Sequence, residues 1–177
     1  MKKVLIVITT AFVPTGGLST VMLNYYRNMN KTGLKIDFCS TNEPEKSLID
    51  ELHSEGSEYF KLPSRKKLLS YFITLVRLCR RYDIIHINAN SATAALELLC
   101  AYCGKVKVRI IHNHNSKTQH PILNKILLPL YNRLYTMAIA CSNEAGEWLY
   151  GKCNFIILNN AIDLKKYTYS HDKRKEL

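Results

Sequence analysis

Short apolar runs alternate with segments of helical periodicity along the whole chain. The runs that predict strands cover residues 3–8, 36–40, 59–62, 84–88, 106–111, 137–142 and 155–158. Between them, apolar residues recur three and four positions apart, which predicts helices over 19–33, 45–55, 65–81, 91–103, 121–136 and 144–150. Regular alternation of this kind is typical of a parallel sheet with helices on both faces. The chain is therefore expected to have an α/β fold.

Polar residues stand where three of the predicted strands end. The first strand leads to Gly16 and Gly17, the strand over 84–88 ends in Asn88, and the strand over 106–111 runs into His112-Asn-His114-Asn115. The carboxyl ends of parallel strands face the ligand crevice of an open sheet. The three strand ends are therefore expected to share one site.

Gly16 and Gly17 precede a predicted helix, so backbone amides and the helix N-terminus there favour a phosphate or another anion. The pair fits neither Gly-x-Gly-x-x-Gly nor a P-loop, which argues against a dinucleotide enzyme and a nucleotide triphosphatase. A plain tight turn remains the alternative for this motif.

His112 and His114 lie two residues apart on an extended segment, so their side chains are expected to point the same way. A zinc site usually needs a third protein ligand, and none stands close in sequence, so we expect no metal and no cofactor. A neutral histidine pair suits the recognition of sugar hydroxyls or phosphate oxygens. His86, inside an apolar strand, is as compatible with a core position as with a site.

The length of 177 residues favours one domain, and the positions of the six cysteines inside apolar segments favour reduced, buried thiols. Cys100 and Cys103 have the spacing of a redox or zinc pair but lack a second pair, so core packing is the better interpretation. The N-terminal apolar run is short and β-branched, which favours a strand over a secretory signal. No run is long enough for a transmembrane helix.

The net charge of +11 comes entirely from residues 59–136, which hold thirteen Lys and Arg but only Asp83 and Glu97. Such a segment attracts phospholipid headgroups, nucleic acid or a phosphate-bearing substrate. In the predicted helix 65–81, Lys67, Arg77 and Arg81 share a polar stripe opposite an apolar face. The members of that apolar face are Leu68, Leu69, Phe72, Leu75, Val76 and Cys79. The stripe is either a solvated face or a surface that rests on an anionic membrane.

Several of these motifs, in this order, resemble those of family 4 glycosyltransferases. They are Gly16-Gly17, Asp83-Ile-Ile-His86, His112-Asn-His114-Asn115, Ala140-Cys141-Ser142 and Ile157-Leu-Asn-Asn160-Ala-Ile162-Asp163. The resemblance covers the whole chain but only the N-terminal domain of that family, and it is strongest to bacterial enzymes of capsular or exopolysaccharide synthesis. It implies a Rossmann-like domain that forms the N-terminal, acceptor-side half of a GT-B fold over residues 1–177. The donor-binding C-terminal domain is then absent from this chain, and the fragment alone is expected to be inactive.

The resemblance further implies transfer of a hexosyl unit from a nucleotide-sugar to a lipid-linked saccharide acceptor, with retention at the anomeric carbon. His114 would act at the reacting centre, and Gly16 and Gly17 would contact the donor phosphate or the acceptor. His112, Asn115 and Asn88 would contact the acceptor or the sugar. The enzyme would be cytoplasmic, at the inner face of the cell membrane if Lys67, Arg77 and Arg81 dock there.

A non-catalytic module that binds an anion or a nucleotide is the alternative class. RNA binding has only the basic segment in its favour, because no RNA-binding motif is recognisable, and no nucleic-acid partner is expected.

Overall fold

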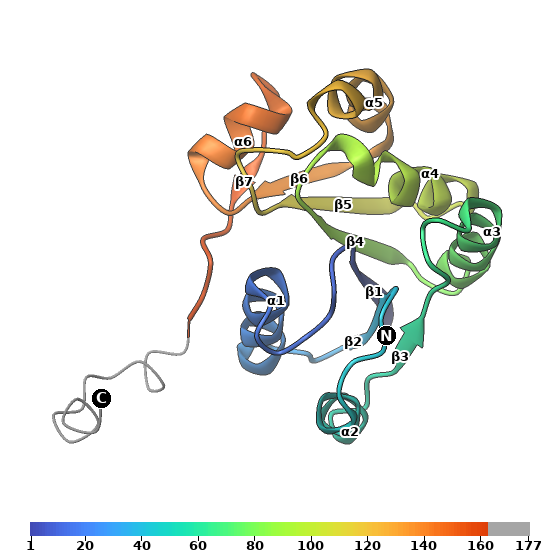
Figure 1. Ribbon diagram of the computed structural model, residues 1–177. Helices are drawn as coiled ribbons and strands as arrows, with labels where there is room; N and C mark the ends of the chain where they lie inside the picture. The colour runs from blue at the N-terminus through green and yellow to red at the C-terminus, as the bar shows by residue number, and fades with distance from the viewer. Residues whose placement is uncertain (163–177) are drawn as a thin grey trace, which may run out of the picture.

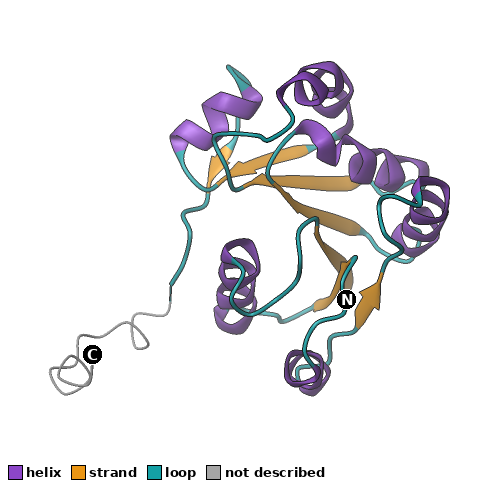
Figure 2. Ribbon diagram, in the orientation of Figure 1, coloured by secondary structure: helices purple, strands orange, loops and turns teal. Residues whose placement is uncertain are grey.

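The computed structural model describes residues 1–162 as a seven-stranded, entirely parallel sheet in the order β3-β2-β1-β4-β5-β6-β7 (Figures 1 and 2). Asp163 and the basic residues near position 175 lie outside the described residues. The strands are β1 (Lys2–Ile8), β2 (Leu34–Ser40), β3 (Tyr59–Lys61), β4 (Ile84–Ala89), β5 (Val108–Asn113), β6 (Met137–Ala140) and β7 (Ile156–Ile157). The predicted α/β class and the parallel sheet are confirmed.

Helices cover both faces of the sheet, as the alternating pattern predicts (Figure 1). The helices are α1 (Gly17–Asn28), α2 (Lys46–Ser54), α3 (Leu68–Cys79), η1 (Ala92–Ala94), α4 (Ala95–Cys103), α5 (Pro121–Leu134) and α6 (Asn143–Tyr150). Ile6, Ile8 and Phe38 pack with residues of α1 and α2 in one apolar cluster. Leu5 and Ile85 belong to a larger cluster with residues of α3, α4, α5 and α6. Because successive residues of β1 enter different clusters, burial on both sides holds this central strand.

The sheet changes winding direction at β1. This strand pairs with β2 (residues 34–40) on one side and with β4 (residues 84–89) on the other. The chain first adds β2 and β3 on one side of β1, and then returns to add β4 on the other side. Loops that leave the carboxyl ends of β1 and β4 therefore diverge to opposite sides. In open α/β sheets this divergence creates the crevice in which ligands bind.

The strand β5 is longer at its carboxyl end than predicted. It runs through His112 and Asn113, because His112 pairs with Asn88 of β4 and Ile139 of β6, and Asn113 pairs with Ala89 and Ala140. His112 is consequently inside the sheet rather than at its exit. Only His114 and the residues after it leave the strand.

The helix α3 is shorter than the predicted 65–81, and its buried face agrees with the prediction only in part. Leu75, Val76 and Cys79 are buried as predicted, whereas Leu68 and Leu69 are exposed. Tyr71 and Leu78 are buried in addition. The prediction was wrong for the first turn because residues 63–67 form a loop. A helical pattern extended through that loop assigns Leu68 and Leu69 to the core.

The predicted helix that Ser19 and Thr20 were expected to open begins earlier, at Gly17, with Gly16 as its N-cap. The two hydroxyls instead stabilise the preceding loop. Ser19 Oγ donates to the carbonyl of Ala11 at 3.0 Å, and Thr20 Oγ1 donates to that of Pro14 at 2.8 Å. The loop that crosses the carboxyl edge of β1 is thereby held to α1.

Gly104 follows α4, as predicted, but space rather than backbone conformation requires glycine there. Its φ is −70°, and the left-handed conformation falls on Lys105 at φ 65°. A Cβ at Gly104 would lie 2.8 Å from Cys79 Cβ. The glycine therefore allows the ends of α3 and α4 to pack closely.

A buried ion pair connects the segment before α3 to α4. Glu97 has no exposed side-chain surface and accepts hydrogen bonds from Arg65 Nη2 at 2.7 Å and from Tyr71 Oη at 2.6 Å. Arg65 also donates to the carbonyl of Thr93 at 3.0 Å. Burial and the carboxylate of Glu97 raise the pKa of Tyr71, so this hydroxyl remains a donor. Arg65 is thus not part of a free basic face.

We expect Glu97→Ala to lower the free energy of unfolding by about 3 kcal/mol, because it leaves Arg65 and Tyr71 without their buried acceptor. Urea denaturation measures the change. The control is Glu51→Ala, which breaks the half-exposed pair with Arg27 and should cost at most about 1 kcal/mol. Equal losses in the two variants would contradict a structural role for the buried pair.

Candidate functional site

Two adjacent pockets open at the carboxyl edge of the sheet, and Asn90 lines both. The pocket of about 470 Å³ beside α1, here the α1 pocket, is lined by Thr15, Gly17, Leu18, Thr20, Val21, Asn90, His114, Asn160, Ala161 and Ile162. The pocket of about 430 Å³ before α5, here the α5 pocket, is lined by Thr10, Asn90, Ser91, Asn115, Lys117, Thr118, Gln119 and His120. The loops after β1, β4 and β5 thus meet at the switch point, as the polar strand ends predict.

The glycine pair forms the turn into α1 at one wall of the α1 pocket. Gly16 is the N-cap, and no side chain caps this helix end. A Cβ on Gly17 would meet nothing within 4 Å, whereas one on Gly16 would lie 3.2 Å from Val13 Cγ2. Gly17 therefore leaves the approach to the helix N-terminus open, and the exposed amides and the helix dipole there favour an anionic group.

His114 lies at another wall of the α1 pocket, just beyond β5. Its Nε2 is 3.0 Å from Asn88 Oδ1, so a neutral imidazole carries its proton on Nε2. Its Nδ1 is buried and makes no hydrogen bond of normal geometry among the described residues, although the Asn160 side chain lies close enough to interact with the ring. Burial lowers the pKa of His114 to about 4, and the nearby Asn160 side chain partly opposes the shift. At neutral pH this side chain is a hydrogen-bonding group without charge.

Three imidazoles stack beneath the pocket, across β4 and β5. The ring centroids of His86 and His112 are 5.6 Å apart, and those of His112 and His114 are 3.9 Å apart. The side chains of His112 and His114 point the same way, as predicted. Burial lowers the pKa of His86 to about 4 and that of His112 to about 2, and the neighbouring histidines add to both shifts. The stack is therefore neutral above pH 5.

The structure assigns different positions to the predicted contact residues of this strand end. His112 has no exposed surface, so it supports His114 from below and does not reach a ligand directly. Asn88 is also buried, and its side chain orients His114. Asn115 is exposed and lines the α5 pocket rather than the α1 pocket. Among the predicted residues, Gly17 and His114 share one pocket.

Residues 158–162 return across the α1 pocket after β7. Asn24 Nδ2 donates to the carbonyl of Ala161 at 2.9 Å, and Tyr25 Oη donates to that of Asn159. These contacts attach the segment to α1 and bring Asn160 close to His114. The pocket is therefore enclosed by segments from the beginning, the middle and the end of the described chain.

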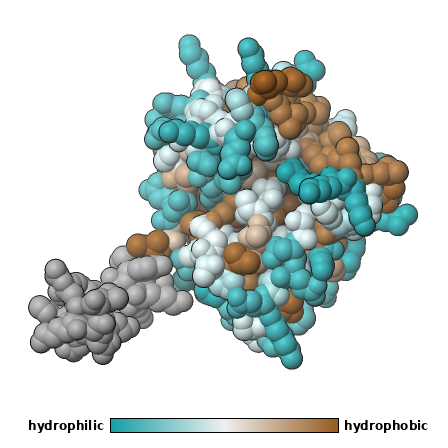
Figure 3. Space-filling model, in the orientation of Figure 1, coloured by the Kyte–Doolittle hydropathy of each residue, from teal (hydrophilic) through white to brown (hydrophobic). Residues whose placement is uncertain are grey.

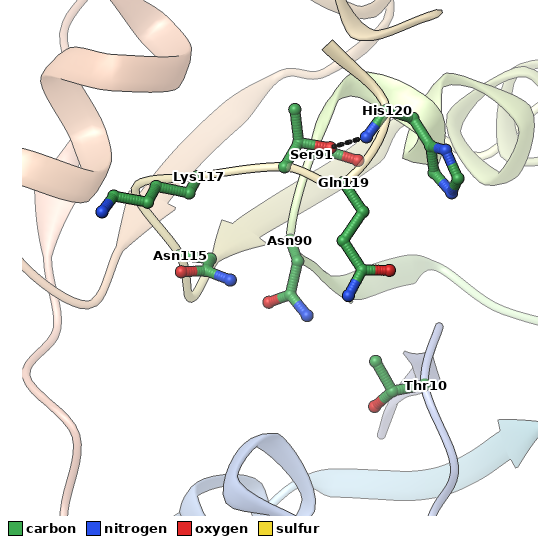
Figure 4. A pocket seen from close by; sticks show the side chains of 8 residues that line it. Thr10, Asn90, Ser91, Asn115, Lys117, Gln119 and His120 are labelled. Carbon is green, nitrogen blue, oxygen red and sulfur yellow. Dashed lines mark hydrogen bonds between the residues drawn. The ribbon is translucent and has the colours of Figure 1, made fainter.

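The α5 pocket carries amide and hydroxyl groups. In Figure 4, Asn90, Asn115 and Gln119 extend into the space that Thr10 faces from the loop after β1, whereas Lys117 extends away. Such groups can donate and accept hydrogen bonds without fixed charge. This arrangement suits a ligand rich in hydroxyls.

The basic residues proposed for an anionic surface are spread along the length of α3. Arg77 and Arg81 line a third pocket beside β3, where the guanidinium of Arg81 lies 5.1 Å from the Phe60 ring centroid. Lys67 precedes α3 at the opposite end of that helix. None of the three lies in the α1 pocket or the α5 pocket.

Sequence reasoning did not select Asn90, Lys117 or Gln119, although all three line the α5 pocket. Asn90 could have been found, because it continues the polar exit of the β4 strand. Lys117 and Gln119 lie in a loop whose path depends on tertiary contacts. Among residues 1–162, no three His, Cys, Asp or Glu side chains come together as a metal site.

The comparisons with known sequences identify the family. The sequence model of Glycosyltransferase Family 4 matches residues 15–166, so the chain belongs to this family. It is 29% identical over 170 residues to EpsF, a candidate glycosyltransferase of Bacillus subtilis (strain 168), with 86% of this chain and 44% of EpsF covered.

Solved structures share the fold at low sequence identity. HepE of Anabaena, solved in complex with UDP-glucose, superposes with a TM-score of 0.71 at 14% identity over 99% of this chain and 48% of HepE. MurG of Acinetobacter baumannii gives a TM-score of 0.63 at 12% identity over 92% and 46%. The sheet therefore matches that of GT-B glycosyltransferases. The chain spans about half the length of the relatives it matches.

None of the helices within residues 1–162 is long and apolar enough to cross a membrane.

The histidine stack predicts a pH-dependent stability. The three folded-state pKa values lie at or below about 4, whereas unfolded histidines titrate near 6.5. The unfolded chain therefore binds up to about three more protons between these pH values, and stability falls as the pH drops below about 6.5. Urea midpoints between about pH 5.5 and 7.5 test this.

His112→Phe, which keeps an aromatic ring in the stack, should reduce the proton uptake on unfolding by about one. The matched control is His120→Gln at an exposed position, which should leave the native contribution of the stack intact. The interpretation would not survive a pH slope in His112→Phe equal to that of the parent.

Proposed function

We propose that this chain forms the acceptor-side half of a glycosyltransferase that moves a hexosyl unit from a nucleotide-sugar to a saccharide acceptor. Membership of family 4 supports glycosyl transfer as the reaction class. The likeness of the fold to HepE, which was solved with UDP-glucose, supports a nucleotide-sugar as the donor. The likeness to EpsF is compatible with a role in the synthesis of cell-surface polysaccharide.

The observation that carries the proposal is the α1 pocket. It combines an open helix N-terminus at Gly17, which favours a phosphate, with the neutral His114, which favours a hydroxyl. A nucleotide-sugar presents both groups within a few bonds of each other. An anion-binding module without catalysis would need the first of these features but not the second.

In the proposed reaction, the bond between the anomeric carbon and the donor phosphate breaks while a bond to the acceptor oxygen forms on the same face. The leaving phosphate oxygen takes up the acceptor proton, and the configuration is retained. Amides at the start of α1 would stabilise the negative charge that develops on the phosphate. His114, with Nε2 bound to Asn88, would accept a hydrogen bond from a sugar hydroxyl through Nδ1 once the neighbouring Asn160 side chain moves away from this buried atom.

The α5 pocket would hold the acceptor, because Asn90, Asn115 and Gln119 can form hydrogen bonds with hydroxyl groups. These side chains carry no charge, which suits a neutral sugar. A lipid-diphosphate carrier on that saccharide is compatible with the basic residues of the middle segment. The enzyme would then act at the cytoplasmic face of the membrane. The chemistry proposed for these residues requires no metal.

The remaining donor contacts would come from sequence beyond this chain, because the matched relatives are about twice as long. Residues 1–177 alone are therefore proposed to be inactive. The experiment uses the intact protein with a panel of UDP-hexoses and a saccharide acceptor, and it measures nucleotide release together with the glycosylated product. Nucleotide-sugar binding without any transfer would favour the non-catalytic module.

His114→Ala in the intact protein should lower kcat by roughly a hundredfold, because an aligned hydrogen-bonding group at the reacting sugar is lost. His112→Ala should lower it less, since His112 is buried beneath His114. Thermal unfolding of both variants separates lost contacts from lost folding. Equal and small effects on kcat would show that His114 does not contact the donor sugar.

Gly17→Ala should leave stability unchanged within about 0.5 kcal/mol, because its Cβ meets no atom of residues 1–162 within 4 Å. Gly17→Val places more volume in the same space. Both should weaken turnover, by up to about a hundredfold for valine, because the side chain displaces the donor phosphate from the helix N-terminus. Unchanged kinetics in both variants would place the phosphate elsewhere.

A further inference from the structure

Exposed apolar side chains cover part of the helix layer on the face opposite α1. Figure 3 shows them gathered over α5 and toward α3. The most exposed are Leu69 of α3 at 73%, Ile122 of α5 at 76% and Ile126 of α5 at 67%. We name this set the apolar helix surface; it also includes Leu68, Ile73 and Leu123. Contiguous exposed apolar residues of this kind mark an interaction site.

The two helices that carry this surface are attached at their N-terminal ends to the same short element, η1. Arg65, just before α3, donates to the carbonyl of Thr93 at 3.0 Å, and Asn124 of α5 accepts from the amide of Ala92 at 2.7 Å. The helix α4, which continues from η1, packs against both α3 and α5. The apolar residues of the two helices therefore flank one element and form one surface.

The charge around the apolar helix surface is positive only. Lys66, Lys67, Lys117 and Lys125 are exposed and form no ion pair among the described residues. No Asp or Glu occurs in residues 59–82 or 98–143. Apolar side chains with a rim of lysines are the combination that inserts into the interface of an anionic bilayer.

We infer that the apolar helix surface docks on the headgroup region of an anionic membrane, with leucine and isoleucine side chains inserted and the surrounding lysines on lipid phosphates. Lys67 belongs to this surface, and Arg77 borders it, because it lies one helical turn beyond Ile73 on the exposed side of α3. Arg81 lies beyond the end of α3, in the pocket beside β3.

This position gives the docking a consequence for the proposed reaction. Lys117 and His120 of the α5 pocket lead directly into α5, so the mouth of that pocket lies next to the docked surface. A saccharide on a lipid carrier could then enter the pocket while its lipid stays in the bilayer. That step rests on the proposed function, whereas the docking itself does not.

The test is co-sedimentation of the intact protein with vesicles of phosphatidylcholine, with or without phosphatidylglycerol, at increasing salt. The parent should bind only the anionic vesicles, and more weakly as salt rises. Leu69→Gln/Ile122→Gln/Ile126→Gln should lower the partition coefficient at least tenfold at low salt. Lys66→Glu/Lys67→Glu/Lys125→Glu should lower it by at least about fivefold for each charge removed.

The matched control is Arg81→Glu/Lys105→Glu/Lys107→Glu, which makes the same change of charge at exposed residues before β4 and β5, away from the apolar helix surface, and should keep most of the binding. Circular dichroism melts confirm that all variants fold. Absence of binding by the parent would overturn the inference, as would equal binding by the parent and the glutamine variant. A larger loss of binding in the control would also overturn it, because it would place the docking surface at the amino edge of the sheet.

The parent could instead form oligomers that do not bind vesicles and that dissociate in the glutamine variant. That result would identify the apolar helix surface as a protein interface and would overturn the inference. Transfer to a short, water-soluble acceptor is measured alongside. Retained transfer together with lost vesicle binding in the glutamine variant would separate docking from catalysis. If the parent binds anionic vesicles but shows no sugar transfer, the proposed function fails and the inferred membrane-docking surface stands.

Discussion

Parallel pairing of β1 with β2 on one side and β4 on the other is the constraint on which the rest of the structure depends. Because of this pairing, the loops after β1 and β4 leave the same edge of the sheet in opposite directions, and a gap remains between them. The α1 pocket fills this divergence. The pairing of β4 with β5 then places His114 beside Asn88 and fixes the orientation of its ring.

The sequence was sufficient to predict the fold, because apolar periodicity and strand–helix alternation are local signals that agree along the chain. It was less informative where tertiary contacts decide. Pairing on both sides extends β5 through His112, and this turns a predicted ligand contact into a buried support. In the same way, a loop replaces the first predicted turn of α3 and exposes Leu68 and Leu69.

Parts of the site were predictable for a different reason. Gly17 and His114 interrupt apolar patterns at strand ends, so their types and positions are visible without a structure. The α5 pocket was not predictable as a unit, because Gln119 and Lys117 come from a loop with no periodic signal. Charge counting also gave no sign that Arg65 is paired, since its partner Glu97 is distant in sequence and buried in the fold. The excess of basic residues therefore identified residues 59–136 as the charged segment, but it did not identify which of them form a common surface.

The stacked histidines have a consequence for the thermodynamics of ligand recognition. Since the pKa of His114 lies near 4 and those of the two rings behind it are no higher, the floor of the α1 pocket neither takes up nor releases protons near neutrality. Protonation of these side chains would therefore not change ligand affinity there near neutral pH. The imidazoles contribute shape and directed lone pairs in place of charge, so discrimination between sugars would depend on the position of single hydroxyl groups. The N-terminus of α1 would attract the anionic part of the ligand.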